Sequence, residues 1–220
     1  YKALGEALAA LPTVQAAAEH SHTLCSHLDD CPAPNHEKAH SEVKFETILT
    51  KKVLEDNNYT IPAGSYYLTG TLSPEKQIRI TGKVTICLNG NDVKAFNNFD
   101  TFSVGKGAEL TITDCENRGT ITHYNDYTGC AVYVDRGTFN LYGGNITGNK
   151  GVVSKSTFAG KTRTDTTGGG VYVSGYDSKA GTFNMYGGSI TKNNARFGGG
   201  VRVNGSVGIF NLYGGSIANN

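Results

Sequence analysis

A short N-terminal segment concentrates the residue types that bind metal ions. Five of the six histidines and two of the five cysteines fall between residues 20 and 40. Imidazole nitrogens and thiolate sulfurs are preferred zinc ligands, and a closed structural site needs only four of them. We therefore expect a structural zinc ion in this segment. Its expected ligands are His22, Cys25, Cys31 and His36, with His20 and His40 as substitutes.

Two other states of this segment stay open. The gap between Cys25 and Cys31 is wider than the spacing of common zinc-binding cysteine pairs. In an exported protein these two cysteines could instead form a disulfide, with the histidines in solvent. A third alternative has neither zinc nor a disulfide. A catalytic zinc site is disfavoured, because candidate ligands are in excess and the sequence has no H-E-x-x-H motif.

A second group of titratable residues lies near the middle of the chain. It comprises His123, Asp126, Asp135 and Arg136, beside Tyr124 and Tyr127. Such a set could act in acid–base catalysis if the fold brought its members together. We favour a solvated loop between strands, because the acidic residues of the chain fall at unrelated positions. No catalytic residue is therefore predicted.

The elements that position these groups follow from an internal repeat. The phrase GTFNMYGGSITKN at Gly181–Asn193 recurs with small changes at Gly137–Asn149 and Gly208–Asn220. Blocks similar to GGGVYV precede each copy, and apolar residues alternate with polar ones as in a strand with one buried face. The longer first step holds an insertion, expected at residues 150–167. Repeats of about 20–45 residues that accept loop insertions are typical of solenoids.

We predict an all-β fold, a right-handed parallel β-helix with a short N-terminal helical or loop segment. Parallel strands of neighbouring coils would lie about 4.8 Å apart. Glycine pairs would supply positive φ at tight corners, and Asn149, Asn193 and Asn220 would adopt left-handed geometry there. The expected inward rows are Phe139, Phe183 and Phe210, and Ile146, Ile190 and Ile217. The expected outward rows are Tyr142, Tyr186 and Tyr213, then Asn140, Asn184 and Asn211, and a further set of Tyr133, Tyr172 and Arg202.

The sequence divides into four parts on this interpretation. Residues 1–19 form a leader that ends in the small residues of a secretory cleavage site, or else a short amphipathic helix. Residues 20–43 form the His/Cys-rich cap, residues 44–127 irregular coils, and residues 128–220 regular coils. The third copy of the phrase stops at Asn220, before the strand that completes the previous coil. We therefore expect an incomplete last coil and a longer parent protein.

Composition excludes several classes of partner. A formal net charge of +1 gives no electrostatic basis for binding nucleic acid or an acidic membrane surface. No apolar stretch approaches the roughly 20 residues of a membrane-spanning helix. The remaining cysteines, Cys87, Cys115 and Cys130, lie within or beside predicted strands. We expect buried thiols there, with a bond between Cys87 and Cys115 of neighbouring coils as the alternative.

The phrases F-N-x-Y-G-G-x-I-x-x-N and G-G-G-V resemble those of secreted, pectin-lyase-like β-helix surface proteins of gut Firmicutes. They are also similar to the repeats of polymorphic outer-membrane adhesins. The order of the His/Cys-rich leader, CLNG at Cys87–Gly90 and LTITDC at Leu110–Cys115 resembles the Firmicutes proteins as well. The resemblance spans roughly residues 18–220. It implies a secreted or cell-surface β-helix, and it implies little about activity.

The resemblance favours a non-catalytic, exported module with a role in adhesion or display. Its partner would be a host or cell-wall glycan, or a protein, bound along the outward Tyr and Asn rows. In the structural alternative, these rows only stack on themselves and stabilise the fold. The alternative function is a carbohydrate-active polysaccharide lyase or hydrolase with a pectin-lyase-like fold. The Asn-Thr-Asp and Gly-His-Gly phrases of polygalacturonases are absent, which disfavours that alternative.

Overall fold

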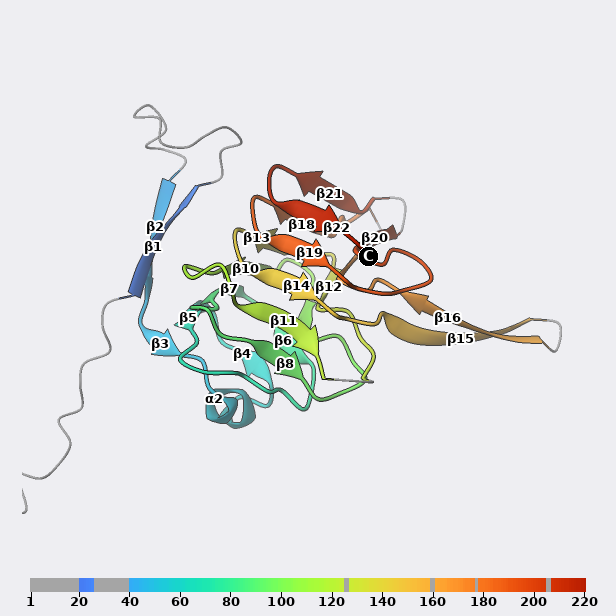
Figure 1. The fold of residues 1–220 in the computed structure, drawn as a ribbon, viewed down its shortest axis with the longest axis horizontal. Coiled ribbons are helices and arrows are strands. Elements are labelled where there is room, and N and C mark those ends of the chain that lie inside the picture. The colour runs from blue at the N-terminus through green and yellow to red at the C-terminus, as the bar shows by residue number, and fades with distance from the viewer. Residues whose placement is uncertain (1–19, 26–39, 125–126, 159–160, 177, 205–206) are drawn as a thin grey trace, which may run out of the picture.

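Three stacks of parallel strands form the body of the molecule (Figure 1). The computed structural model describes residues 20–25, 40–124, 127–158, 161–176, 178–204 and 207–220. Within these residues the chain is almost entirely β, and from β7 onward each turn of the chain visits the three sheets in a fixed order. The predicted all-β, parallel β-helix solenoid is therefore confirmed.

The first sheet has seven strands, in the order in which the coils stack. They are β3 (Thr47–Ile48), β5 (Gly64–Tyr67), β7 (Lys83–Cys87), β10 (Glu109–Thr113), β13 (Thr138–Leu141), β18 (Thr182–Met185) and β21 (Ile209–Leu212). The second sheet consists of β8 (Val93–Ala95), β11 (Thr120–His123), β14 (Asn145–Thr147), β19 (Ser189–Thr191) and β22 (Ser216–Ala218). The third consists of β4 (Thr60–Ile61), β6 (Ile78–Ile80), β9 (Phe102–Val104), β12 (Val132–Asp135), β17 (Val171–Ser174) and β20 (Val201–Asn204).

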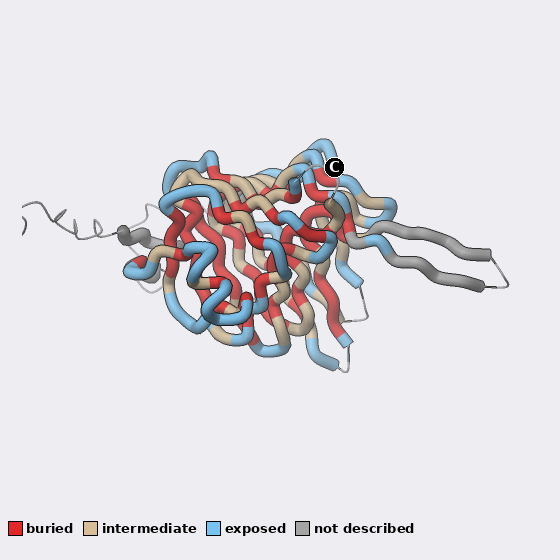
Figure 2. The backbone as a smooth tube through the Cα atoms, turned by 90° about the horizontal axis from the view of Figure 1, so that it is seen from below, coloured by how far each residue is buried: buried red, intermediate tan, exposed pale blue. Residues whose placement is uncertain are grey.

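The core is a continuous column of apolar side chains inside the three sheets. Phe139, Phe183 and Phe210 are in register on β13, β18 and β21, and their successive ring centroids lie 4.9 Å apart. Ile146 and Ile190 continue the column from the second sheet and are fully buried. Figure 2 shows that the buried residues lie mainly within the strands and the exposed ones mainly at the corners. The register of both predicted inward rows is confirmed, and their burial holds except in the last coil, where Phe210 is half-buried and Ile217 is exposed.

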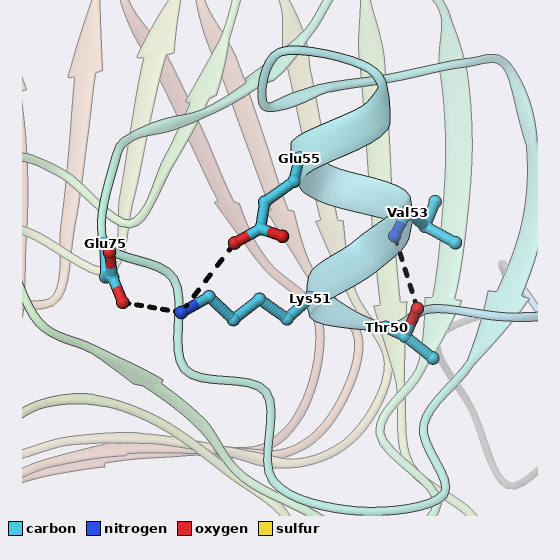
Figure 3. A network of polar contacts seen from close by, with 5 residues as sticks. All are labelled: Thr50, Lys51, Val53, Glu55 and Glu75. Carbon is cyan, nitrogen blue, oxygen red and sulfur yellow. Dashed lines mark hydrogen bonds and ion pairs between the residues drawn. The ribbon is translucent and has the colours of Figure 1, made fainter.

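The first coil departs from this pattern because a short helix takes the place of its second-sheet strand. Helix α2 (Lys51–Asp56) begins after Thr50, whose side chain accepts a hydrogen bond from the Val53 N–H at 3.3 Å. Lys51 Nζ lies 2.6 Å from Glu75 Oε1 and joins the helix to the loop before β6 (Figure 3). Leu54 is fully buried in the core, so α2 covers the end of the column opposite β21 (Figure 1).

Two antiparallel hairpins extend from the solenoid. Strands β1 (His20–Cys25) and β2 (His40–Phe45) pair with each other, and Phe45 at the end of β2 packs against Tyr67 and Cys87 of the first sheet. Strands β15 (Val152–Phe158) and β16 (Lys161–Thr167) form the insertion predicted at residues 150–167, which projects from the side of the coils (Figure 1).

Backbone crowding explains the glycine pair at the repeat's corner. Gly188 has a φ of +77°, as predicted for a tight corner. A Cβ at Gly187 would lie 2.4 Å from the Tyr142 carbonyl oxygen, and a Cβ at Gly188 would lie 2.5 Å from the Gly144 oxygen. Stacking of one corner on the next therefore requires glycine at both positions, in addition to the positive φ.

The role predicted for the corner asparagines is wrong. The left-handed residues are the preceding ones, Gly148 (φ +70°), Lys192 (+56°) and Asn219 (+56°). Asn149 and Asn193 are buried and turn their amides into the solenoid. The amide nitrogen of Asn149 donates to Asn193 Oδ1 at 2.9 Å, and that of Asn193 donates to Asn220 Oδ1 at 3.0 Å. These residues form an internal amide ladder, because a polar side chain inside the coil must satisfy its hydrogen bonds there.

Candidate functional site

The three tyrosines that follow strands β13, β18 and β21 stack on one another, as predicted. The ring centroids of Tyr142 and Tyr186 are 4.5 Å apart, those of Tyr186 and Tyr213 are 4.9 Å apart, and the interplanar angles are 16° and 21°. The Tyr186 ring, in the middle of the row, therefore has both faces covered by its neighbours. Ring edges and hydroxyl groups are the parts that can reach a ligand.

The three outward asparagines form a second row beside the tyrosines. The amide nitrogen of Asn184 donates to Asn140 Oδ1, and that of Asn211 donates to Asn184 Oδ1, both at 2.9 Å. Asn140 extends the row toward the N-terminus by donating to Glu109 Oε1 and Thr111 Oγ1. The Asn184 amide, in the middle of the row, keeps one N–H and one lone pair for an external partner. The sequence interpretation missed Glu109 and Thr111, although GAELTIT matches the start of the repeat phrase.

Tyr186, in the middle of the row, is neutral at physiological pH. Burial raises the pKa of Tyr186 above its ordinary value, and the neighbouring Tyr213 and Glu109 raise it further. The hydroxyl therefore keeps its proton and can both donate and accept a hydrogen bond. Together the two rows present a neutral surface of donors and acceptors that repeats once per coil.

A third outward row crosses the third sheet and carries positive charge at Arg202. Tyr133, Tyr172 and Arg202 are in register on β12, β17 and β20. The two tyrosine rings lie 5.3 Å apart at an angle of 43°, and the Arg202 guanidinium lies 5.6 Å from the Tyr172 ring centroid. This confirms the predicted register of the set. Its tilted rings stack less closely than those of the first sheet.

The described members of the group around His123 do not assemble as a catalytic set. His123 is buried, with Nδ1 at 2.8 Å from Asn149 Oδ1 and Nε2 at 2.8 Å from the Phe99 carbonyl oxygen. Arg136 forms two hydrogen bonds with Asp135 and lies 4.0 Å from the Tyr176 ring centroid. The interpretation of a solvated loop is wrong for His123, whose ring nitrogens are both engaged inside the fold. Asp126 lies outside the described residues.

A carboxylate and a thiol from neighbouring coils meet close to His123. Asp100 Oδ1 accepts hydrogen bonds from the Cys130 N–H at 3.0 Å and from Cys130 Sγ at 2.9 Å. Burial raises the pKa of Asp100 and raises that of Cys130 well above the ordinary value of a thiol. Cys130 is thus a buried neutral thiol, as predicted, and its chemistry is that of a structural group.

Replacing Asp100 by asparagine is expected to stabilise the protein increasingly as pH rises. A raised pKa of Asp100 means that the folded state binds the carboxyl proton more tightly than the unfolded state does. The wild-type protein therefore loses stability as the pH rises from about 4, the pKa of an unfolded aspartate, through the higher pKa of the folded state. Asparagine keeps an oxygen for both Cys130 hydrogen bonds and carries no charge. Thermal melts of both proteins between about pH 4 and pH 7 test this. A difference in Tm that does not change with pH would contradict it.

Part of the predicted zinc segment lies outside the described residues. Cys31 and His36 are among the residues that the structure leaves undescribed. The other candidate ligands lie on the β1–β2 hairpin, whose backbone places Cys25 opposite His40. In the same register, His22 is opposite Val43 and His20 is opposite Phe45. The described part of the chain contains no group of three or more His, Cys, Asp or Glu side chains that could hold a metal ion. The structural zinc ion stays a prediction.

Comparison with protein-family models, with curated proteins and with solved structures finds no match to this chain. The fold assignment therefore rests on the sheet topology and the register of the strands. Among the described residues, no helix has the length and apolar character needed to cross a lipid bilayer.

Proposed function

We propose that this chain is a non-catalytic, exported β-helix module of a bacterial surface protein, with a role in adhesion or display. One observation carries the proposal. The outward Tyr and Asn rows run without a break in register across β13, β18 and β21, and no acidic side chain of these strands interrupts them. A regular, neutral, hydrogen-bonding surface is suited to binding an extended partner.

The partner that this surface suits best is a neutral glycan or an extended protein segment lying along the rows. Stacking covers both faces of the Tyr186 ring, which removes the usual platform for a sugar ring at that position. Phenol hydroxyls and amide groups remain, and both pair with sugar hydroxyls or with peptide groups. Strand spacing of about 4.8 Å repeats these groups at an interval close to the length of one sugar unit. Shallow, multivalent contact is therefore expected in place of a deep pocket.

A glycan array with the full chain tests this proposal, and Tyr186 is the residue to vary. Tyr186→Phe removes one hydroxyl and keeps the stack, so we expect about a fivefold loss of affinity for any glycan that the protein binds. Tyr172→Phe on the third sheet is the matched control and should leave binding unchanged. Unchanged binding by Tyr186→Ala would exclude the rows as the site.

The same preparation can test the alternative of a carbohydrate-active lyase or hydrolase. Acidic polysaccharides incubated with the protein, with and without Ca²⁺, should remain intact if the module only binds. Depolymerisation that follows the purified protein would overturn the non-catalytic proposal.

A further inference from the structure

Two thiols from neighbouring coils face each other on the outside of the first sheet. Cys87 ends β7, and Cys115 lies in the turn that follows β10. Their Sγ atoms are 3.8 Å apart. We infer that Cys87 and Cys115 are a reactive dithiol that closes to a disulfide between coils, with Cys115 as the attacking sulfur and Cys87 as the resolving one. This inference does not rest on the proposed binding function.

The turn that carries Cys115 is held in place by the buried side chain of Asp114. Its Oδ1 accepts a hydrogen bond from the Gly90 N–H at 2.7 Å, and its Oδ2 accepts one from the Gly119 N–H at 2.7 Å. The first bond joins the turn to the coil that contains Cys87. Closure requires the two sulfurs to approach from 3.8 Å to about 2.05 Å, which a small rotation of exposed Cys115 can supply.

The two sulfurs differ in exposure, and this difference sets their roles. Cys115 is exposed, and its Sγ lies 3.4 Å from Asn89 Oδ1. Cys87 is buried beneath Phe45 of β2 and Tyr67 of β5. Burial raises the pKa of Cys87 to about 12, and its titratable neighbours are Cys115 and Tyr67. Cys115 is therefore the sulfur of this pair that an oxidant in solution can reach.

The chemistry consists of two thiol–disulfide exchanges with a soluble disulfide such as oxidised glutathione. The Cys115 thiolate attacks one glutathione sulfur, the S–S bond of glutathione breaks, and one glutathione thiolate leaves. Cys87 then loses its proton and attacks Cys115 Sγ, which expels the second glutathione as a thiolate that takes up a proton. One molecule of oxidised glutathione is thus reduced to two thiols while the protein gains one disulfide.

The second exchange should be slow at neutral pH and faster in alkali. Well below a pKa of about 12, the thiolate fraction of Cys87 rises about tenfold for each pH unit. A glutathione adduct on Cys115 should therefore accumulate near pH 7 and convert to the disulfide near pH 9. The closed bond ties the coil of β7 to the coil of β10, so the oxidised protein should melt several degrees higher.

Incubation of the full chain with oxidised glutathione, followed by acid quench and peptide mass spectrometry, tests the inference. We expect the adduct on Cys115 first and a linked Cys87–Cys115 peptide later. Cys87→Ser should retain the adduct at both pH values, and Cys115→Ser should leave Cys87 unmodified. Buried Cys130 is an internal control for opening of the fold. A wild-type adduct that never converts, or modification of Cys87 in Cys115→Ser, would overturn the inference.

Discussion

Replacement of Asn193 by alanine is expected to lower the free energy of unfolding by about 3–4 kcal/mol. The amide nitrogen of Asn193 donates to the Ile146 carbonyl oxygen at 3.0 Å, and its Oδ1 accepts from the Asn149 N–H at 3.0 Å and Asn149 Nδ2 at 2.9 Å. Asn149 is fully buried, so these groups would lose their partner where water cannot replace it. Each unsatisfied buried group costs about 1–3 kcal/mol.

Asn184→Ala is the matched control for this experiment. It removes the same side chain from the outer row, where Asn184 is half-buried and water can satisfy the amide of Asn211. A cost of about 1 kcal/mol or less is expected there. Urea unfolding followed by circular dichroism measures both. Equal losses of stability in the two variants would show that the internal ladder contributes no more than the external one.

The repeat in the sequence was sufficient to predict the strands and the register of their side chains. Closely similar phrases place Phe139 on Phe183 and Tyr142 on Tyr186, because the parallel strands of neighbouring coils pair residue by residue. Period-2 alternation then separates the inward phenylalanines from the outward asparagines. The rows of the candidate site follow from these two rules alone.

The incorrect predictions concern residues at the corners of the coils. There the alternation of inward and outward residues along a strand no longer decides which way a side chain points. Asn149 and Asn193 follow the left-handed residue instead of occupying it, and so they turn inward. His123 lies at the end of β11 next to that ladder, and its burial depends on Asn149, which is distant in sequence. Cys115 was expected to be buried, yet it lies in an exposed turn that Asp114 sets.

Local signals were also too weak to predict two other elements. Helix α2 has only six residues, and the main support that the sequence offers is the cap at Thr50. The inserted hairpin β15–β16 consists largely of Thr, Ser and Lys, which are as typical of loops as of strands. Pairing along the whole length of the hairpin determines its structure, and composition does not show that pairing.

Replacement of Phe183 by alanine is expected to cost about 4–5 kcal/mol, near the upper end of the range for buried aromatic residues. Phe183 is fully buried, and its ring stacks at 4.9 Å on both Phe139 and Phe210. Most cores relax partly around a lost ring. Here β13, β18 and β21 are held at fixed spacing by parallel hydrogen bonds, so the two flanking rings cannot close the gap.

This argument also predicts that the cavity persists and can be refilled. An apolar cavity lined by aromatic and aliphatic side chains stays dry and binds small apolar molecules. Benzene should therefore raise the Tm of Phe183→Ala and leave the Tm of the wild-type protein and of Tyr186→Ala unchanged, because Tyr186 stacks on the outside. Calorimetry with and without benzene measures this. No rise in Tm for Phe183→Ala would mean that the coils collapse around the missing ring, and that the backbone spacing is softer than the strand pairing implies.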